Sequence, residues 1–465
     1  MTRVEMQNDG PTQSRRTFLR GTLAGSAMLL GGCSLPFQVN NAPTPIVKEP
    51  VTLNWICETG FKSDIKSFEM LARMYNTLNH DQITVNVHPG TAYDTLQQML
   101  TSQNPADRVQ YDILSLDVVW MSEFASKNWI IPLDRYWPNW RSKATTTSYL
   151  QAPFQAASYH GQLWGAPLHT DVGILYYRKD MVGSEPNIKS WDDLERMALE
   201  AQSQKGLRWG FTWQAQPFDG NGKVNEAMIC NLVEILSGYG GKIFDDAHNP
   251  AQVLIDSSEA RKALSKMKSW LQTISPDVTN NDEGRSTLQW KTGQAVFMRN
   301  WPAAVVDSLD HSSSQVFDKF DIITLPFSTD SHTGGGCLGG YQLAINYFSS
   351  IEKRDAAWKF IWWMLQHDAQ HYLAVQENFP VTLAEIYDDD EIKNRNPYYN
   401  RVKNYVNNAQ FRPVLPHYQC ATKAIATMIK NIFNDQTTSD EALPLLKGQL
   451  QSILALKPSD PCPSP

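Results

Sequence analysis

The body of the chain alternates short apolar runs with longer amphipathic segments. Residues 51–57 (VTLNWIC), 83–88 and 111–117 are short runs rich in apolar and β-branched residues, which is typical of strands. Between these runs, apolar positions recur at helical spacing in residues 65–78 and 93–100. Strands that alternate with helices predict a mostly parallel sheet covered by helices, with ligand sites outside the carboxyl ends of the strands.

The same alternation continues towards the C-terminus. Ser190 with Asp193, and Thr438 with Glu441, have the spacing of a capping box and predict two helix starts. By the same criteria we expect strands at residues 295–301, 320–325 and 341–345, and helices at residues 260–271 and 358–365. The sequence therefore predicts an α/β protein without internal repeats.

The first 50 residues have the plan of an export signal. A basic segment, Ser-Arg-Arg-Thr-Phe-Leu-Arg at 14–20, precedes an apolar stretch at 23–30 and the run Leu-Gly-Gly-Cys at 30–33. These features resemble a twin-arginine signal and a bacterial lipobox. We expect a signal peptide at 1–32, lipidation of Cys33 and a Pro-rich tether at 33–50. A plain cleaved signal with an incidental cysteine is the alternative.

Charge and composition narrow the class of protein. The chain has 465 residues, enough for two or three domains, and 42% of them are hydrophobic. Its 41 Lys and Arg residues against 48 Asp and Glu residues give a net charge of -7, which argues against nucleic-acid binding. No stretch after the signal is long enough to span a bilayer. We expect an exported, monomeric, membrane-anchored lipoprotein that faces the periplasm or the cell exterior.

Five cysteines follow Cys33, at positions 57, 230, 337, 420 and 462. They form no C-x-x-C motif, so neither a redox motif nor a zinc knuckle is indicated. One disulfide is possible in an oxidising compartment, but the sequence does not show which cysteines pair.

Recognisable catalytic and metal motifs are missing. The chain has no G-x-S-x-G, no Walker-type loop, no dinucleotide G-x-G-x-x-G and no H-E-x-x-H. His367 and His371 have metal-ligand spacing, but residue 368 is Asp, and we expect both to be solvated or to cap a helix. We therefore predict no enzyme activity, no catalytic residues, no cofactor and no metal.

Isolated acidic and aromatic residues instead stand at the predicted strand ends. Glu58 and Asp117 each follow or end a strand, and Asp171, Trp301 and Tyr341 stand next to others. Sugars have apolar faces that stack on aromatic rings and hydroxyl groups that bond to carboxylates. This pattern favours a sugar site, although helix caps and core packing are the alternative for each residue taken singly.

Several segments resemble the extracellular solute-binding proteins of carbohydrate ABC importers, of the maltose/trehalose type (bacterial solute-binding protein family 1). They are LDVVW at 116–120, WGAPLHTDVGILYYR at 164–178, SWDDL at 190–194, GFTWQ at 210–214, GQAVFMRNWP at 293–302, GGYQLAI at 339–345 and AAWKFI at 356–361. Each segment is weakly specific alone, but together and in this order they span most of residues 51–456. The sequence departs from the family pattern at 218–228, which is longer and more polar, and at Tyr341, where Trp is common.

The resemblance implies a two-lobe periplasmic-binding-protein fold of type II, with the ligand cleft at the hinge. We expect lobe one at 51–160 plus 302–348, lobe two at 161–301 plus 349–456, and a disordered tail at 457–465. It also implies that the ligand is held by a set of acidic, basic and aromatic residues. This set comprises Glu58, Asp117, Trp120, Asp171, Trp213, Trp301, Gly340, Tyr341 and Arg412, the last of these from the segment FRPV.

The implied function is the capture of a di- or oligosaccharide or a glucoside osmolyte for an ABC permease. Trehalose, maltose, sucrose and glucosylglycerol are the candidate ligands. Two alternatives stay open from the residues alone. The protein could be a lipid-anchored glycoside hydrolase, which also needs paired carboxylates, or a sensory sugar-binding protein.

Overall fold

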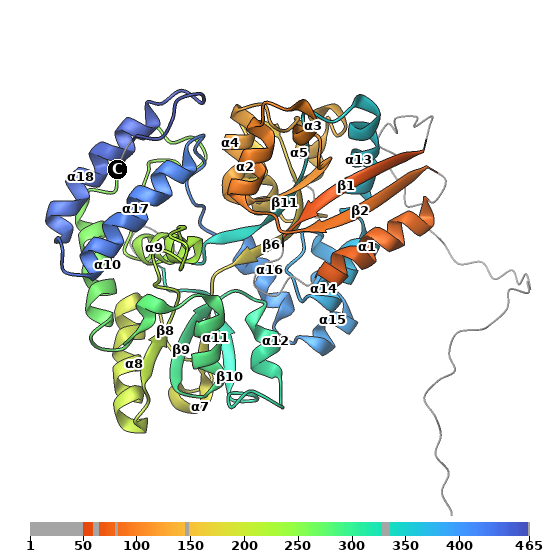
Figure 1. Ribbon diagram of the computed structural model, residues 1–465. Coiled ribbons are helices and arrows are strands. Elements are labelled where there is room, and N and C mark those ends of the chain that lie inside the picture. Colours follow the sequence, from red (N-terminus) through yellow and green to blue (C-terminus); the bar gives the residue numbers. More distant parts are fainter. Residues whose placement is uncertain (1–49, 59–64, 80–81, 145–147, 328–334, 464–465) are drawn as a thin grey trace, which may run out of the picture. The chain divides into compact units, whose positions relative to one another are not determined.

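The computed structural model describes residues 50–58, 65–79, 82–144, 148–327 and 335–463 (Figure 1). The predicted signal peptide, Cys33 and nearly all of the tether lie outside these residues. Residues 42–465 form one compact unit.

A five-stranded sheet forms the centre of lobe one. Its strand order is β2 (Ile83–Pro89), β1 (Val51–Cys57), β3 (Ile113–Asp117), β11 (Leu338–Ile345) and β6 (Ala166–Val172). Strands β2, β1 and β3 pair in parallel, and β11 pairs antiparallel with both β3 and β6. All strands except β11 therefore run in one direction.

A four-stranded sheet forms the centre of lobe two. Its order is β10 (Phe320–Ile323), β7 (Ile174–Arg178), β9 (Ala295–Asn300) and β8 (Trp209–Thr212), with β7 as the one reversed strand. Both sheets are mixed and flanked by helices, so the predicted α/β class is confirmed. A small hairpin, β4 (Ser158–Tyr159) with β5 (Gln162–Leu163), completes the described strands.

Helices cover both sheets. Those around the five-stranded sheet are α1 (Ile65–Leu78), α2 (Tyr93–Thr101), α3 (Pro105–Arg108), α4 (Met121–Ser126), α5 (Trp140–Ala144), α6 (Gln151–Ala156), α13 (Ile351–Met364), α14 (His367–Gln376), α15 (Asp390–Arg395) and α16 (Tyr399–Asn407). Those around the four-stranded sheet are α7 (Lys179–Val182), α8 (Trp191–Lys205), α9 (Glu226–Gly238), α10 (Ser258–Trp270), α11 (Glu283–Lys291), α12 (Ala304–Leu309), α17 (Tyr418–Phe433) and α18 (Ser439–Leu454). Both predicted capping boxes are present, at the starts of α8 and α18.

Several segments, among them β6, β10 and α13, lie in the lobe opposite to the one expected. Strand β6, expected in lobe two, belongs to the five-stranded sheet, and β10, expected in lobe one, belongs to the four-stranded sheet. Helix α13, also expected in lobe two, packs on β1 and β11 of lobe one. The reason is that β6 and β10 pair with strands distant in sequence, which local patterns do not reveal.

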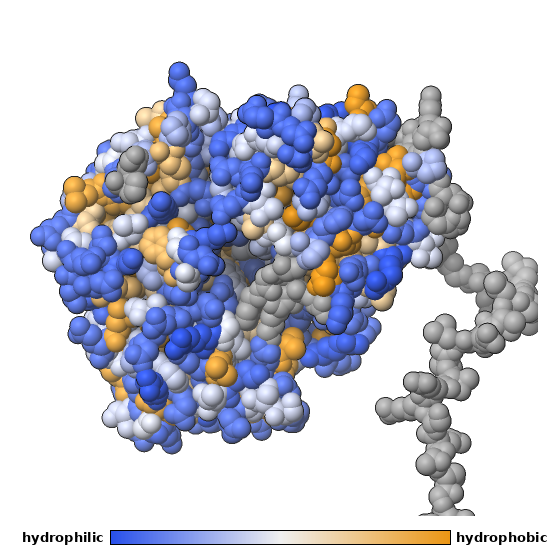
Figure 2. Space-filling model, viewed as in Figure 1, coloured by the Kyte–Doolittle hydropathy of each residue, from blue (hydrophilic) through white to orange (hydrophobic). Residues whose placement is uncertain are grey.

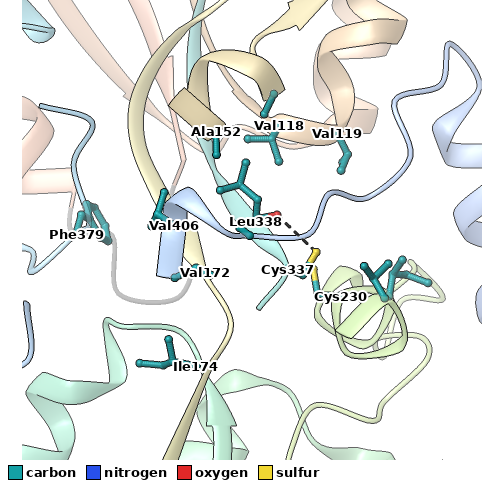
Figure 3. Close-up of a cluster of buried hydrophobic side chains, with 14 of the residues drawn as sticks. Val118, Val119, Ala152, Val172, Ile174, Cys230, Cys337, Leu338, Phe379 and Val406 are labelled. Atoms are coloured by element: carbon teal, nitrogen blue, oxygen red, sulfur yellow. Dashed lines mark hydrogen bonds between the residues drawn. The ribbon is translucent and has the colours of Figure 1, made fainter. Parts of the chain in front are cut away.

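The chain crosses between the sheets along three adjacent segments. Strand β6 continues through Gly173 into β7, residues 335–337 lead into β11, and residues 409–414 lie alongside them. The Gly173 N–H donates to the Cys337 carbonyl at 3.1 Å, and the Leu338 N–H donates to the Gln410 carbonyl at 2.7 Å. Figure 3 shows Val172, Ile174, Cys337 and Leu338 gathered at this crossing.

A buried ion pair lies beside the crossing segments. Glu234 of α9 and Arg299 of β9 are fully buried, with 2.8 Å between Arg299 Nε and Glu234 Oε2. The Glu234 carboxylate also accepts the Cys337 N–H at 2.9 Å. An added Cβ at Gly173 would lie 1.9 Å from Glu234 Oε1, so only glycine allows the crossing backbone to pass so close.

The C-terminal tail is not free, which corrects the expectation of a disordered tail. A disulfide joins Cys420 of α17 to Cys462, and His417 Nε2 lies 2.8 Å from the Lys457 carbonyl oxygen. Cys57, Cys230 and Cys337 are buried free thiols. The proline content of the tail favoured disorder. The sequence did not show that Cys420 lies close enough to Cys462 to hold the tail in place.

The visible face of the molecule is mainly hydrophilic, with apolar side chains scattered over it (Figure 2). Across the described segments, helices that would be both long and apolar enough to cross a bilayer do not occur.

Candidate functional site

A cavity lies between the two sheets and encloses about 770 Å³ of empty space, including the solvent at its open mouth. Its lining residues are Glu58, Asp117, His169, Asp171, Glu226, Ala227, Cys230, Glu283, Trp301, Ala303, Gly339, Gly340, Tyr341, Phe379 and Arg412. They come from both lobes, and most stand at the ends of strands or at the starts of helices.

Lobe one presents its groups from the carboxyl ends of β1 and β3 and from two antiparallel strands. Glu58 follows β1, Asp117 ends β3, and Tyr341 of β11 lies opposite both Asp117 and His169. Gly340 has a φ of +113°, and a Cβ there would lie 2.5 Å from the His169 carbonyl oxygen. Glycine is therefore required for β11 to bring Tyr341 to the cavity.

Arg412 connects the two lobes electrostatically. Its guanidinium lies 3.2 Å from Asp117 Oδ1 in lobe one and 3.0 Å from Glu226 Oε2 at the start of α9 in lobe two. Arg412 is 5% exposed, so these ion pairs are largely shielded from water. Tyr418 and Thr422 also donate to the Glu226 carboxylate. Burial raises the pKa of Glu226, and the charge of Arg412 partly offsets this effect.

A second ion pair lies deeper in lobe one. His169 Nε2 is 2.8 Å from Glu58 Oε1, and the imidazole stacks on Phe379 with ring centroids 4.1 Å apart. Burial opposes the imidazolium, but the hydrogen bond and charge of Glu58 outweigh it, so the pKa of His169 is raised. Glu58 is 2% exposed, and its second oxygen, Oε2, has no hydrogen-bond partner among the described residues.

Asp171 is a carboxyl group of the cavity whose pKa is raised. Burial raises the pKa of its carboxyl group to about 7, although His169 and Arg299 act in the opposite direction. The carboxylate of Glu283 raises it further. Its Oδ1 atom is buried without a hydrogen-bond partner in the described part of the chain. A carboxyl group with these properties is common at functional sites.

Trp301 supplies a flat apolar surface beside Asp171. It follows β9, its indole N–H donates to Glu283 Oε1 at 3.2 Å, and the Arg299 guanidinium lies 4.0 Å from its ring centroid. The Arg299 contact and the hydrogen bond to Glu283 fix the orientation of the ring. Aromatic rings fixed in this way can stack on the apolar face of a sugar.

The comparisons with known proteins agree with this architecture. Residues 70–397 match the family model of the bacterial extracellular solute-binding proteins. The chain belongs to this family. A "Probable ABC transporter-binding protein" of Deinococcus radiodurans is 26% identical over 418 residues, covering 87% of this chain and 94% of the relative. A "Maltotriose-binding protein" of Pyrococcus abyssi is 24% identical, covering 71% of this chain and 67% of the relative.

A solved structure of another solute-binding protein is also similar. It is described as maltose-bound MalE3 of T. maritima, has a TM-score of 0.74 and 27% identity, and covers 87% of this chain and all of its own. The similarity confirms the two-lobe fold of this solute-binding protein.

The cavity of this solute-binding protein collects most of the residues expected from the sequence. Seven of the nine line it, namely Glu58, Asp117, Asp171, Trp301, Gly340, Tyr341 and Arg412. Trp213 does not, because it is fully buried among the aromatic core residues of lobe two. Trp120 packs against Tyr93 and Phe124 instead of lining the cavity.

Several lining residues were not predicted. Glu226 and Glu283 each occupy the first turn of a helix, where an acidic residue is expected for helix stability alone. His169 is two positions before the predicted Asp171 on the same strand, and this period-2 spacing could have indicated it. Phe379 gave no usable signal.

The two histidines noted in the sequence, His367 and His371, both lie on α14. Neither is among the residues that line the cavity. Groups of three or more His, Cys, Asp or Glu side chains suited to a metal ion do not occur in the described segments.

Proposed function

We propose that this chain is the sugar-binding subunit of an ABC importer and that it captures a di- or oligosaccharide or a glucoside osmolyte in the cavity between its lobes. The observation that carries the proposal is the convergence of carboxylates, one buried arginine and aromatic rings from both lobes on one open cavity. The family membership and the named functions of the two relatives support it.

Binding would proceed by closure of the lobes. A ligand that touches Asp117 and Tyr341 of lobe one together with Trp301 of lobe two makes all its contacts only when the lobes are close. It therefore stabilises the closed state by its difference in affinity for the two states. The closed shape would then be what the membrane permease recognises.

A thermal-shift screen tests this function. The ligands are trehalose, maltose, sucrose, glucosylglycerol and monosaccharides, each added to the purified protein at increasing concentration. A ligand at 100 times its dissociation constant stabilises the folded state by about 2.7 kcal/mol, which is easily detected. Failure of every saccharide and glucoside to raise the melting temperature would overturn the proposal.

One observation favours the alternative of a glycoside hydrolase. Asp171 has a pKa of about 7 and shares its cavity with other carboxylates, as a general acid would. We propose binding without turnover, because the chain contains no recognisable catalytic motif. Prolonged incubation with each disaccharide should return it intact. Sugar release that disappears in Asp171→Asn would establish the hydrolase instead.

We further propose that Cys33 carries the lipid that anchors the monomer at the membrane surface. The motivation is the Leu-Gly-Gly-Cys run at the end of an apolar segment of signal length. Cys33→Ser should yield soluble or unprocessed protein in cell fractionation. Normal processing and membrane retention of this variant would contradict the lipobox.

A further inference from the structure

The cavity carries more acidic than basic groups. Its lining includes five carboxyl side chains, those of Glu58, Asp117, Asp171, Glu226 and Glu283, but the only basic side chains in the lining are those of His169 and Arg412. A neutral saccharide needs hydrogen-bond acceptors in its site, but it does not need an excess of negative charge.

The basic groups are already paired with acidic residues. Arg412 contacts Asp117 and Glu226, and His169 contacts Glu58. The nearby Arg299 lies beneath Trp301 and forms its ion pair with Glu234. In the described part of the chain, Asp171 and Glu283 therefore have no cationic partner in an ion pair.

Two buried oxygen atoms independently indicate a missing donor. Asp171 Oδ1 and Glu58 Oε2 are buried without hydrogen-bond partners among the described residues, and Glu58 itself is 2% exposed at the cavity wall. Leaving a buried carboxylate oxygen unpaired is costly, so these atoms favour a bound group that donates hydrogen bonds.

Asp171 and Glu283 are grouped around one aromatic ring. Glu283 accepts the indole N–H of Trp301. Across the strand, a Cβ built at Gly339 would lie 3.2 Å from Asp171 Cβ and 3.4 Å from the Trp301 ring. Both carboxyl groups therefore border the place where a sugar ring would stack on Trp301.

We propose that the ligand carries a protonated amino group and that this group binds between Asp171 and Glu283 while the sugar ring stacks on Trp301. This inference rests on the proposed function and narrows the ligand to amino sugars and amine-bearing oligosaccharides. An ammonium group supplies three hydrogen-bond donors together with the positive charge that the pair lacks. A hydroxyl group at the same place supplies one donor and no positive charge.

Calorimetric titration with matched ligand pairs tests the proposal. In each pair one member carries free amino groups and the other does not: trehalose against its 2-amino-2-deoxy derivative, and the glucosamine disaccharide against its N-acetylated form. The amino member of at least one pair should bind at least tenfold tighter than its neutral partner at pH 7. This preference should decrease when the salt concentration is raised.

Two variants locate the amino-binding site. Asp171→Asn and Glu283→Gln keep the shape of the side chains and remove one charge each, so each should reduce the amino preference to less than threefold. The amino preference of the unaltered protein remains informative even if one variant fails to fold. Glu200→Gln, on the exposed face of α8, is the matched control and should retain the full preference.

The outcomes separate this inference from the function on which it rests. If neutral members bind as tightly as amino members in both pairs, the inference is wrong and the sugar-binding function stands. A preference that survives in both variants also overturns it, because the amino group must then bind elsewhere. If no neutral or amino saccharide binds, both the inference and the proposed function fail.

Discussion

Trp301 and Trp213 have different surroundings although both lie in segments that resemble the family. Trp301 lines the cavity, with Arg299 against its ring, whereas Trp213 is fully buried against Phe211 and Trp270. The sequence placed each in a segment that resembles the family but did not show towards which side its ring points. Of the two, only Trp301 is placed to contact a ligand in the cavity.

This difference gives a prediction for the two tryptophans. Trp301→Ala should weaken sugar binding by about tenfold or more, since aromatic stacking contributes about 0.5–1.5 kcal/mol beyond the buried area. Trp213→Phe should lower the melting temperature of the unliganded protein and leave the affinity unchanged within about twofold. Calorimetric titration and thermal unfolding of both variants provide the measurements. A large affinity loss in Trp213→Phe alone would show that the site is misplaced.

Asp171 gives a prediction about pH. Its pKa is raised to about 7 in the folded protein, chiefly by burial, whereas an unfolded Asp has a pKa of about 4. The folded state therefore gains stability from protonated Asp171 below pH 4, and this contribution is lost as the pH rises through 7. Unliganded Asp171→Asn should become more stable relative to the unaltered protein between pH 4 and 7.

Differential scanning calorimetry of the two unliganded proteins across this range is the measurement. His169, Arg299 and Glu283, which also influence Asp171, are present in both proteins, so the difference isolates one carboxyl group. Melting temperatures that stay parallel over the whole range would contradict the raised pKa.

The acidic and aromatic residues beside predicted strands indicated more of the site than the predicted helices did. Glu58, Asp117 and Asp171 were identified because carboxylates that stand beside predicted strands suit the hydroxyl groups of a sugar. Glu226 and Glu283 were missed because an acidic residue in the first turn of a helix already has a sufficient structural explanation. Only the strand pairing and the close approach of the lobes bring them to the cavity.

At the scale of elements, local signals placed most helices and strands within a few residues. The predicted helix at 65–78 coincides with α1, and the capping boxes at Ser190 and Thr438 mark the starts of α8 and α18. Apolar periodicity and caps act over neighbouring residues, so they are readable locally. The disulfide of the tail is a long-range feature and was not readable.

That disulfide should stabilise the C-terminal helices. Cys420 and Cys462 are 42 residues apart, and closing a loop of this size restricts the unfolded chain by about 2–4 kcal/mol. The double variant Cys420→Ser with Cys462→Ser should lower the free energy of unfolding by this amount in urea titrations. Ligand affinity should not change, because neither residue lines the cavity.

Reduction of the unaltered protein serves as the control. Reduction should reproduce the stability of the double variant. The other described cysteines, Cys57, Cys230 and Cys337, are already free thiols, so a reductant changes only the disulfide. An unaltered free energy of unfolding in both experiments would mean that the tail is not joined to α17.

At the scale of the whole molecule, Gly173 is the position where a single methyl group would disturb both lobes. Its added Cβ would meet Glu234 Oε1 at 1.9 Å and Arg299 Nη2 at 2.6 Å. Gly173→Ala should therefore displace a fully buried ion pair and destabilise the protein by about 3 kcal/mol or more. Gly220→Ala is the matched control, because nothing lies within 4 Å of its added Cβ.

Urea unfolding of the two variants measures the difference. Equal stabilities would show that the crossing backbone has room to move and that the Glu234 carboxylate does not hold it. Sugar binding by Gly173→Ala should be weakened as well, since Arg299 also supports Trp301.

The lobe boundaries were the part of the fold least predictable from the sequence. Strands β6 and β10 have ordinary apolar patterns that do not indicate which sheet they join. Their membership depends on pairing with β11 and β7, respectively. Such pairing is determined by the packing of the complete chain.

The late position of β11 also has a consequence for the synthesis of the protein. Strand β3 ends at Asp117, but its neighbour β11 ends only at Ile345, and β6 reaches the sheet solely through β11. At about 5–20 residues per second, the ribosome needs about ten seconds or more to make the intervening chain. During this time the nascent five-stranded sheet exposes an unpaired apolar edge, which is a template for aggregation. The emerging polypeptide should therefore depend on a chaperone until translation has passed Ile345.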